Sequence, residues 1–118
     1  MSGAAKRALP MPKFELTPSQ WDFGRWQVGR ASQAHIFTLI NQGEMPFSIG
    51  PVIINTNQSV YNFKIEDNRC NVMLNPGDKC NVVVRFIPRS GGYLLGTLQI
   101  PVGKRLATAS LSGAGVVE

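Results

Sequence analysis

The sequence predicts an all-β sandwich, and three observations support that prediction. Short stretches that alternate apolar and polar residues recur along the chain at the spacing typical of sandwich strands. No window of a dozen residues combines helical apolar periodicity with freedom from glycine and proline. Twelve glycines and eight prolines, spread through the chain, supply the turns that many short strands need.

The strand signals follow one another through the chain. Trp21 and Phe23 alternate with Asp22, which predicts two aromatic side chains in the core and one carboxylate facing solvent. Further strands are expected over 34–41, 47–54, 60–66, 80–87, 93–100 and 106–111.

The stretch 34–41 has apolar residues on both of its faces. Phe37 and Leu39 share the face expected in the core, while Ile36 and Ile40 lie on the opposite face. A sheet with one free surface should carry polar residues there. We therefore expect Ile36 and Ile40 either to be covered by the arm or a loop, or to contact another molecule.

The connections carry recognisable turn chemistry. Asn75-Pro76-Gly77-Asp78 suits a type II turn, because proline presets φ at the second position and glycine supplies positive φ at the third. The polar stretch 41–45 predicts a loop between two antiparallel strands, with Gly43 at a position that needs positive φ. Two further breaks are expected at 88–92 and 103–104.

Length and composition indicate one globular domain and exclude several classes of protein. The chain has 118 residues, 43% of them hydrophobic and 16% charged, which is enough to form a buried core. The formal net charge is +5, but the basic residues are dispersed, so nucleic-acid binding is only an alternative. No apolar run reaches the roughly 20 residues of a membrane helix. The N-terminus lacks the apolar stretch of a signal peptide, and we expect a virion or cytoplasmic location.

Residues 1–12 predict an extended N-terminal arm ahead of a domain over 13–118. The arm has neither periodicity nor bulk, so it is expected either to be a disordered tail or to lie across a neighbouring subunit. In the second case the candidate partner contacts are Lys6, Arg7, Leu9, Met11, Lys13, Ile36 and Ile40.

No catalytic, cofactor or metal site is predicted. His35 is the single histidine, and it opens a predicted strand without a nucleophile motif around it. The seven carboxylates fall mostly at turns and strand ends. Phosphate-binding glycine loops are absent, and two cysteines with one distant histidine do not make a metal ligand set. We therefore expect a protein that is not an enzyme and holds no cofactor.

Eight landmarks occur in order along the chain. They are Pro18, Trp21-Asp22-Phe23-Gly24, Val28-Gly29, the stretch from Phe37 to Gly43, Pro76-Gly77, Phe86-Ile87-Pro88, Gly92-Tyr93 and the stretch from Leu111 to Gly115. Together they resemble the immunoglobulin-like ASH domains (ASPM, SPD-2 and Hydin type), which are related to major sperm protein (MSP) and to bacterial choice-of-anchor D modules. The resemblance covers about residues 14–115 and implies an immunoglobulin-like β-sandwich of about seven or eight antiparallel strands.

The resemblance also implies a disulfide between Cys70 and Cys80, because bacterial members commonly carry a cysteine pair around the Pro-Gly turn. A regular hairpin centred on Pro76-Gly77 would instead place residue 73 opposite Cys80, about 10 Å of strand away from Cys70. Disulfide-bonded cysteines keep their Cα atoms within roughly 7 Å. The bond therefore requires the turn to pass between the sheets or the Cys70 end to curl back. Two buried thiols remain the alternative, which a reducing cytosol would favour.

The expected function is that of a structural or adaptor protein. It would use its sandwich and arm for contacts with the protein subunits of a large assembly. The expected assembly is a bacteriophage virion, and the partner subunits can include further copies of this chain. Cytoskeletal or ciliary modules, where eukaryotic relatives serve, and exported periplasmic modules are alternatives. A basic nucleic-acid-binding accessory protein is the alternative from a different class.

Overall fold

The computed structural model describes residues 12–56, 61–71 and 73–117, and over these residues it contains strands and no helix. None of the described elements is therefore a helix able to cross a membrane. The strands are β1 (Phe14–Thr17), β2 (Gln20–Gln27), β3 (His35–Asn41), β4 (Ile53–Asn55), β5 (Phe63–Asn68), β6 (Lys79–Phe86), β7 (Gly92–Val102) and β8 (Arg105–Val116).

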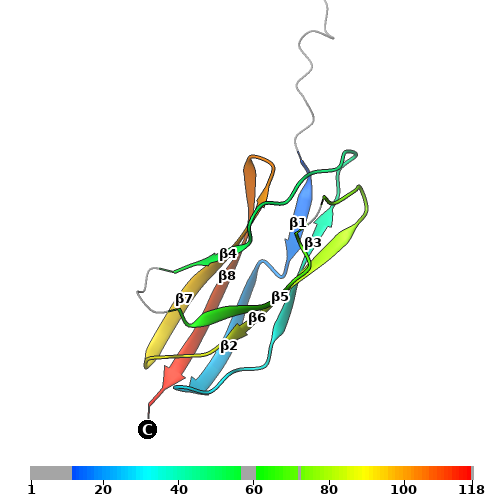
Figure 1. Cartoon of the computed structure of the whole chain (residues 1–118). Coiled ribbons are helices and arrows are strands. Elements are labelled where there is room, and N and C mark those ends of the chain that lie inside the picture. The colour runs from blue at the N-terminus through cyan, green and yellow to red at the C-terminus, as the bar shows by residue number, and fades with distance from the viewer. Residues whose placement is uncertain (1–11, 57–60, 72, 118) are drawn as a thin grey trace, which may run out of the picture.

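These strands form two four-stranded sheets that pack face to face (Figure 1). One sheet has the order β1-β3-β6-β5 and the other has the order β2-β8-β7-β4. The prediction of an immunoglobulin-like sandwich is thereby confirmed. One pair, β2 with β8, is parallel and departs from the antiparallel expectation. The two residues between β1 and β2 carry the chain into the other sheet without reversing it, so β2 keeps the direction of β1.

The core lies between the sheets and is filled by alternate residues of each strand. In β6, Cys80, Val82, Val84 and Phe86 are buried, as the alternation over 80–87 predicts. Three aromatic rings meet in the middle of the core, with centroid separations of 5.1 to 6.0 Å. They belong to Phe23, Phe63 and Phe86.

The strand expected over 47–54 is mostly wrong. Only β4 is a strand in this region, and it pairs with β7. Before it, Phe47 forms a single bridge to Leu74, and Ile49 forms a single bridge to Val102 of β7. This segment crosses from one sheet to the other. Its alternating apolar residues therefore do not lie along one strand, and Phe47 and Ile49 pair with different parts of the chain.

Trp21 corrects a second expectation. Asp22 faces solvent and Phe23 is in the core as predicted, but the Trp21 side chain is 39% exposed. It lies against His35 of the opposite sheet, with ring centroids 3.5 Å apart and an interplanar angle of 8°. Trp21 therefore covers the side of the core between β2 and β3 and is not enclosed by it.

Candidate interaction surfaces

The loop after β3 is organised by the buried side chain of Asn41. Its Nδ2 donates hydrogen bonds to the carbonyl oxygens of Met45 (3.0 Å) and Leu74 (2.9 Å), and its Oδ1 accepts one from the Gly43 N–H (2.9 Å). The side chain thus joins two loops and has a structural role. Gly43 does not have the positive φ that we expected, because the Asn41 amide closes this turn through its own hydrogen bond.

Cys70 and Cys80 form a disulfide, with their Cα atoms 5.1 Å apart. The register of β5 with β6 pairs Asn68 with Val82, and its continuation brings Cys70 opposite Cys80. The regular hairpin register, with residue 73 opposite Cys80, is therefore wrong. Leu74 does not continue the pairing with β6, because it forms a bridge with Phe47.

The type II turn at the far end of this loop is present as predicted. The N–H of Asp78 donates to the carbonyl oxygen of Asn75 (2.9 Å), and Gly77 has a φ of 84°. The turn packs against the end of β3, since the Gly77 N–H donates to the Asn41 carbonyl oxygen (2.9 Å).

His35 packs between aromatic rings. Besides the Trp21 stack, it meets Phe37 edge-on with centroids 5.4 Å apart. Partial burial lowers the pKa of His35, because the neutral ring is preferred where water is displaced. This packing accounts for the histidine without a catalytic role. Within the described ranges, no three His, Cys, Asp or Glu residues come together as a possible metal site.

The outer face of the β1-β3-β6-β5 sheet carries charged residues. The Arg85 guanidinium lies 3.2 Å from the Glu66 carboxylate and also donates to the Ser32 carbonyl oxygen (2.6 Å). Two predicted contact residues lie on this face. Ile36 is 53% exposed, and Ile40 is half-buried between its cross-strand neighbours on β1 and β6.

The other predicted contact residues belong to the arm or its boundary. Lys13 is exposed at a hollow that Gly43, Met45 and Arg105 also line. Lys6, Arg7, Leu9 and Met11 lie outside the described residues. The structure therefore brings Lys13 near the Asn41 loop but does not join it to Ile36 in one surface.

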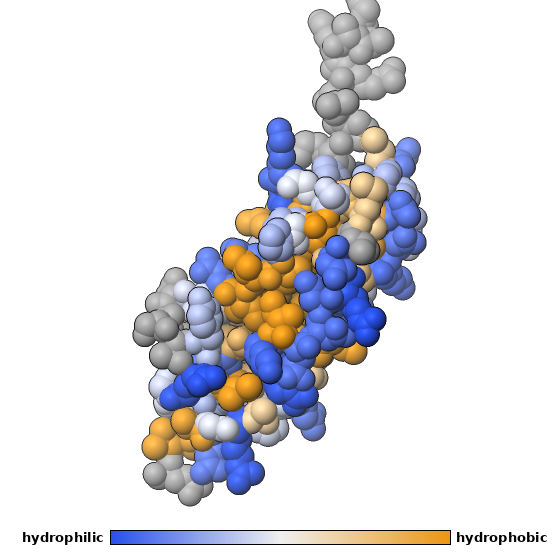
Figure 2. Space-filling view, in the orientation of Figure 1, coloured by the Kyte–Doolittle hydropathy of each residue, from blue (hydrophilic) through white to orange (hydrophobic). Residues whose placement is uncertain are grey.

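An apolar patch lies on the side of the sandwich where β4 and β5 meet (Figure 2). Each of these strands is at the edge of its sheet, and the two edges approach at Gly96, where an added Cβ would lie 3.1 Å from Phe63 and 3.3 Å from Ile54. Four partly buried side chains pack on the core here. We call them the edge patch: Ile49, Val52, Ile54 and Ile65.

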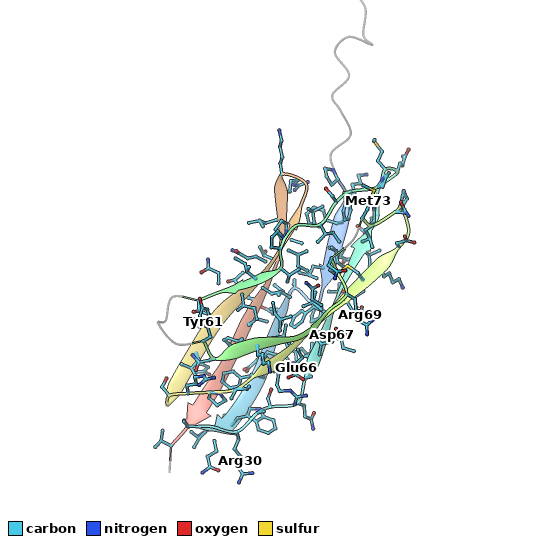
Figure 3. The ribbon with its side chains drawn as sticks, in the orientation of Figure 1. Arg30, Tyr61, Glu66, Asp67, Arg69 and Met73 are labelled. Atoms are coloured by element: carbon cyan, nitrogen blue, oxygen red, sulfur yellow. A yellow bond between two sulfur atoms is a disulfide. The ribbon has the colours of Figure 1, made fainter. Side chains whose placement is uncertain are left out.

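Charged residues border the edge patch along β5. Glu66, Asp67 and Arg69 follow one another beside it (Figure 3), and Arg69 Nε lies 3.0 Å from Asp67 Oδ2. The pairing of β5 with β6 is irregular between Ile65 and Asp67, where a bulge shifts the register. Charges and bulges of this kind limit uncontrolled pairing of an exposed strand edge. The regular part of the β5 edge is therefore its first half, next to the patch.

The outer face of β4, β7 and β8 is uncharged. On β7, Tyr93 (78% exposed) and Leu95 (60% exposed) point outward and alternate with the buried Leu94. Their neighbours across the strand pair are the small residues Ala114 and Ser112 of β8. We call this surface the neutral face. Its outward side chains are Ile53, Asn55, Tyr93, Leu95, Thr97, Gln99, Leu106, Thr108, Ser110, Ser112 and Ala114.

Sequence reasoning missed both the edge patch and the neutral face. For the neutral face a signal was present, because Lys104 and Arg105 are the only charged residues between 90 and 117. Lys104 lies in the hairpin turn and Arg105 begins β8. For the edge patch no local signal exists. Its residues come from two sheets, and only the tertiary arrangement brings them together.

Comparison with known proteins identifies relatives at the level of family and fold. The sequence model of the family described as "Transmembrane protein 131-like N-terminal" matches residues 14–101. No curated protein sequence matches the chain.

The solved structures that are similar in fold include the following three. The ASH/PapD-like domain 7 of human CEP192 has a TM-score of 0.62 and 16% identity, covering 95% of this chain and 94% of that domain. WR4, an MSP family member of C. elegans, has a TM-score of 0.52 and 5% identity, covering 87% of this chain and 97% of that one. The secreted serine protease VesC of Vibrio cholerae has a TM-score of 0.64 and 19% identity over 80% of this chain.

The chain spans only 21% of the length of VesC. At these identities the likeness concerns the fold alone. The predicted ASH/MSP-like fold is thereby confirmed. Structures with this fold thus include one domain of CEP192, the MSP family member WR4 and a part of the VesC protease.

Proposed function

Because this chain belongs to the family of transmembrane protein 131-like N-terminal domains, with an ASH/MSP-like sandwich, we propose that it is a non-enzymatic module that binds other proteins. The observation that supports this most is the edge patch. It places apolar side chains at the surface between two strands whose outer edges pair with no further strand among the described residues.

The chemistry of the edge patch favours an extended apolar segment as its ligand. An edge strand offers unpaired backbone N–H and C=O groups on one side, which a second extended chain can satisfy. Aliphatic side chains beside that edge would receive alternate side chains of the added segment. Fully burying one such side chain is worth about 1.5–3 kcal/mol, so a few contacts suffice for a specific complex.

A selection of displayed random peptides tests this function. We expect enriched peptides to carry apolar residues at every second position and to bind the wild type. Val52→Lys and Ile65→Lys should each weaken binding, while Ile36→Lys, which makes the same kind of change on the opposite sheet, should not. Thermal unfolding of each variant shows whether it is folded. The proposal fails if no peptide is enriched, or if binding is lost in Ile36→Lys and retained in both patch variants.

We propose further that the assembly is a bacteriophage virion, and that the protein is found in the virion or in the cytoplasm before release. The disulfide supports a particle or an exported location over a cytoskeletal or ciliary one, because the cytosol keeps most thiols reduced. Purified particles should contain the chain with its disulfide intact. Recovery from a periplasmic fraction alone would favour the exported alternative.

In the same assembly the arm would lie across a neighbouring subunit. A variant without residues 1–11 should then keep its fold and lose incorporation into the particle. Equal incorporation of both forms would contradict this role for Lys6, Arg7, Leu9 and Met11.

The nucleic-acid alternative depends on the net charge of +5. A protein that neutralises several phosphates binds DNA with an affinity that falls steeply as salt is raised. We expect only weak binding without sequence preference, because carboxylates pair with basic residues on the charged sheet, as Glu66 does with Arg85 and Asp67 with Arg69.

A further inference from the structure

We propose that two copies of the chain pair through their neutral faces, which is a second interaction site, independent of the edge patch. Three features of the described residues support a second copy as the occupant. They are the absence of charge on this face, a matched arrangement of protruding and recessed residues, and the area available.

The distribution of charge favours self-association here. Two molecules that each carry +5 repel one another, and an interface must avoid placing like charges together. Strands β4 and β7 contain no charged residue, and in β8 the only one is Arg105 at its first position. On β2, Asp22 and Arg25 have opposite signs and lie at the rim of the face. The neutral face therefore allows two copies to approach without opposing like charges.

The shape of the face is self-complementary. Tyr93 and Leu95 protrude from β7, while recesses lie beside them on β8. One recess is lined by Ser110, Leu111 and Ser112 of β8, with Asp22 of β2 on its far side. The other is lined by Ala114, Gly115 and Val116 of β8, with Arg25 of β2 on its far side. Protruding residues and recesses thus alternate across neighbouring strands at the same height.

One two-fold axis matches protrusions to recesses. If the axis runs parallel to the strands between β7 and β8, then β7 of one copy lies over β8 of the other at the same height. The cross-strand register then sets Tyr93 over Ala114 of the second copy, and Leu95 over Ser112 of the second copy. Each contact occurs twice, as a two-fold interface requires.

The area fits a weak dimer. At about 3.4 Å per residue and about 4.8 Å between strands, β4, β7 and β8 with their 3, 11 and 12 residues cover roughly 420 Å² as a flat projection. Two such faces bury about 850 Å² together, which lies below the range of stable interfaces and at the low end of that of transient ones. We therefore expect a dimer that forms at micromolar concentration and dissociates on dilution.

Sedimentation velocity of the full chain between roughly 5 and 500 µM tests the proposal. The wild type should shift from monomer toward dimer as its concentration rises. Tyr93→Lys and Ala114→Asp should each raise the dissociation constant at least about tenfold. A lysine at position 93 would meet Arg25 of the second copy, and an aspartate at position 114 would fill the recess that receives Tyr93. Ile36→Lys, on the charged sheet, should dimerise like the wild type.

Mixing the two charged variants tests the geometry. In a mixed dimer Lys at position 93 of one copy meets Asp at position 114 of the other, while the second such contact keeps its native residues. The mixture should therefore dimerise more strongly than either variant alone. A wild type that stays monomeric at the highest concentration overturns the proposal. So does a dimer that is unaffected by Tyr93→Lys, or a mixture that is no better than its components.

Discussion

At the scale of single residues, polar and aromatic side chains join the loops and the two sheets of the described structure. Asn41 joins the loops at one end, and the stack of Trp21 on His35 links the two sheets. These side chains are the chemically distinctive ones in the sequence, and each has a packing role. For Asn41 and His35 we therefore predict effects on the stability of the fold, and we assign protein binding to the exposed surfaces.

Replacing Asn41 with alanine should lower the free energy of unfolding by about 2–4 kcal/mol. The change removes three hydrogen bonds and leaves two carbonyl oxygens and the Gly43 N–H without this partner. Urea unfolding of the variant measures the loss. Gln42→Ala is the matched control, because Gln42 is exposed and its side chain makes an exposed hydrogen bond to Glu15 (3.1 Å). Equal stabilities for the two variants would contradict the role given to Asn41.

His35 should make the protein less stable in mild acid. Its folded pKa is lowered by burial, so the unfolded chain binds more protons in that range. The contribution of His35 to stability is present above its unfolded pKa of about 6.5 and is lost as the pH falls through the lowered folded pKa. Urea unfolding at about pH 7.5 and about pH 5 should show a smaller loss of stability in His35→Gln than in the wild type. The account is contradicted if both lose the same amount.

At the scale of elements, the disulfide and the edge strands define the β5 side of the molecule. Cys70 and Cys80 join the chain directly after β5 to the second residue of β6, while the bulge and charges of β5 keep its second half from pairing further. The regular first half of β5 remains next to the edge patch. Rigid support on one side of an open edge is what an extended ligand needs, since the edge is ordered before the ligand arrives.

Removing the disulfide should destabilise the fold without changing its topology. Closing a loop between residues 10 apart in sequence stabilises the folded state by about 2–3 kcal/mol in the chain-entropy model. The double variant Cys70→Ala/Cys80→Ala should unfold at a correspondingly lower urea concentration than the wild type. Adding a reductant should lower the unfolding midpoint of the wild type to a similar concentration. The reductant should have no effect on the double variant. A wild type that responds to reductant no more than the variant would show that the bond is not formed.

At the scale of the whole molecule, the two sheets present different surfaces. One carries ion pairs around Arg85 and the other is nearly free of charge. Phe37 and Leu39, and likewise Val82 and Val84, are apolar residues at every second position of a strand. This pattern was enough to predict the sandwich, because burial with a period of two is a local property. The parallel pairing of β2 and the crossing at Phe47 and Ile49 were not predictable, because they depend on which sheet each segment joins.

The same distinction separates what was predicted of the candidate sites from what was not. The pairing of Cys70 with Cys80 followed from the family resemblance. The regular hairpin register was wrong because Leu74 pairs with Phe47 and not with β6. The edge patch combines Val52, Ile54 and Ile65 from segments that share no sequence pattern. Surfaces of this kind arise only from the tertiary arrangement.

Site-specific photo-crosslinking in the cells that make the protein tests the central claim most directly. In one variant a photoreactive phenylalanine analogue replaces Val52 in the edge patch. In a separate variant it replaces Thr38, which lies on the outer face of the charged sheet. The account predicts a discrete adduct with another protein at position 52 that disappears when Ile65→Lys is added, and no such adduct at position 38. An adduct at position 38 alone, or one at position 52 that persists in Ile65→Lys, would contradict the claim that the edge patch binds the partner.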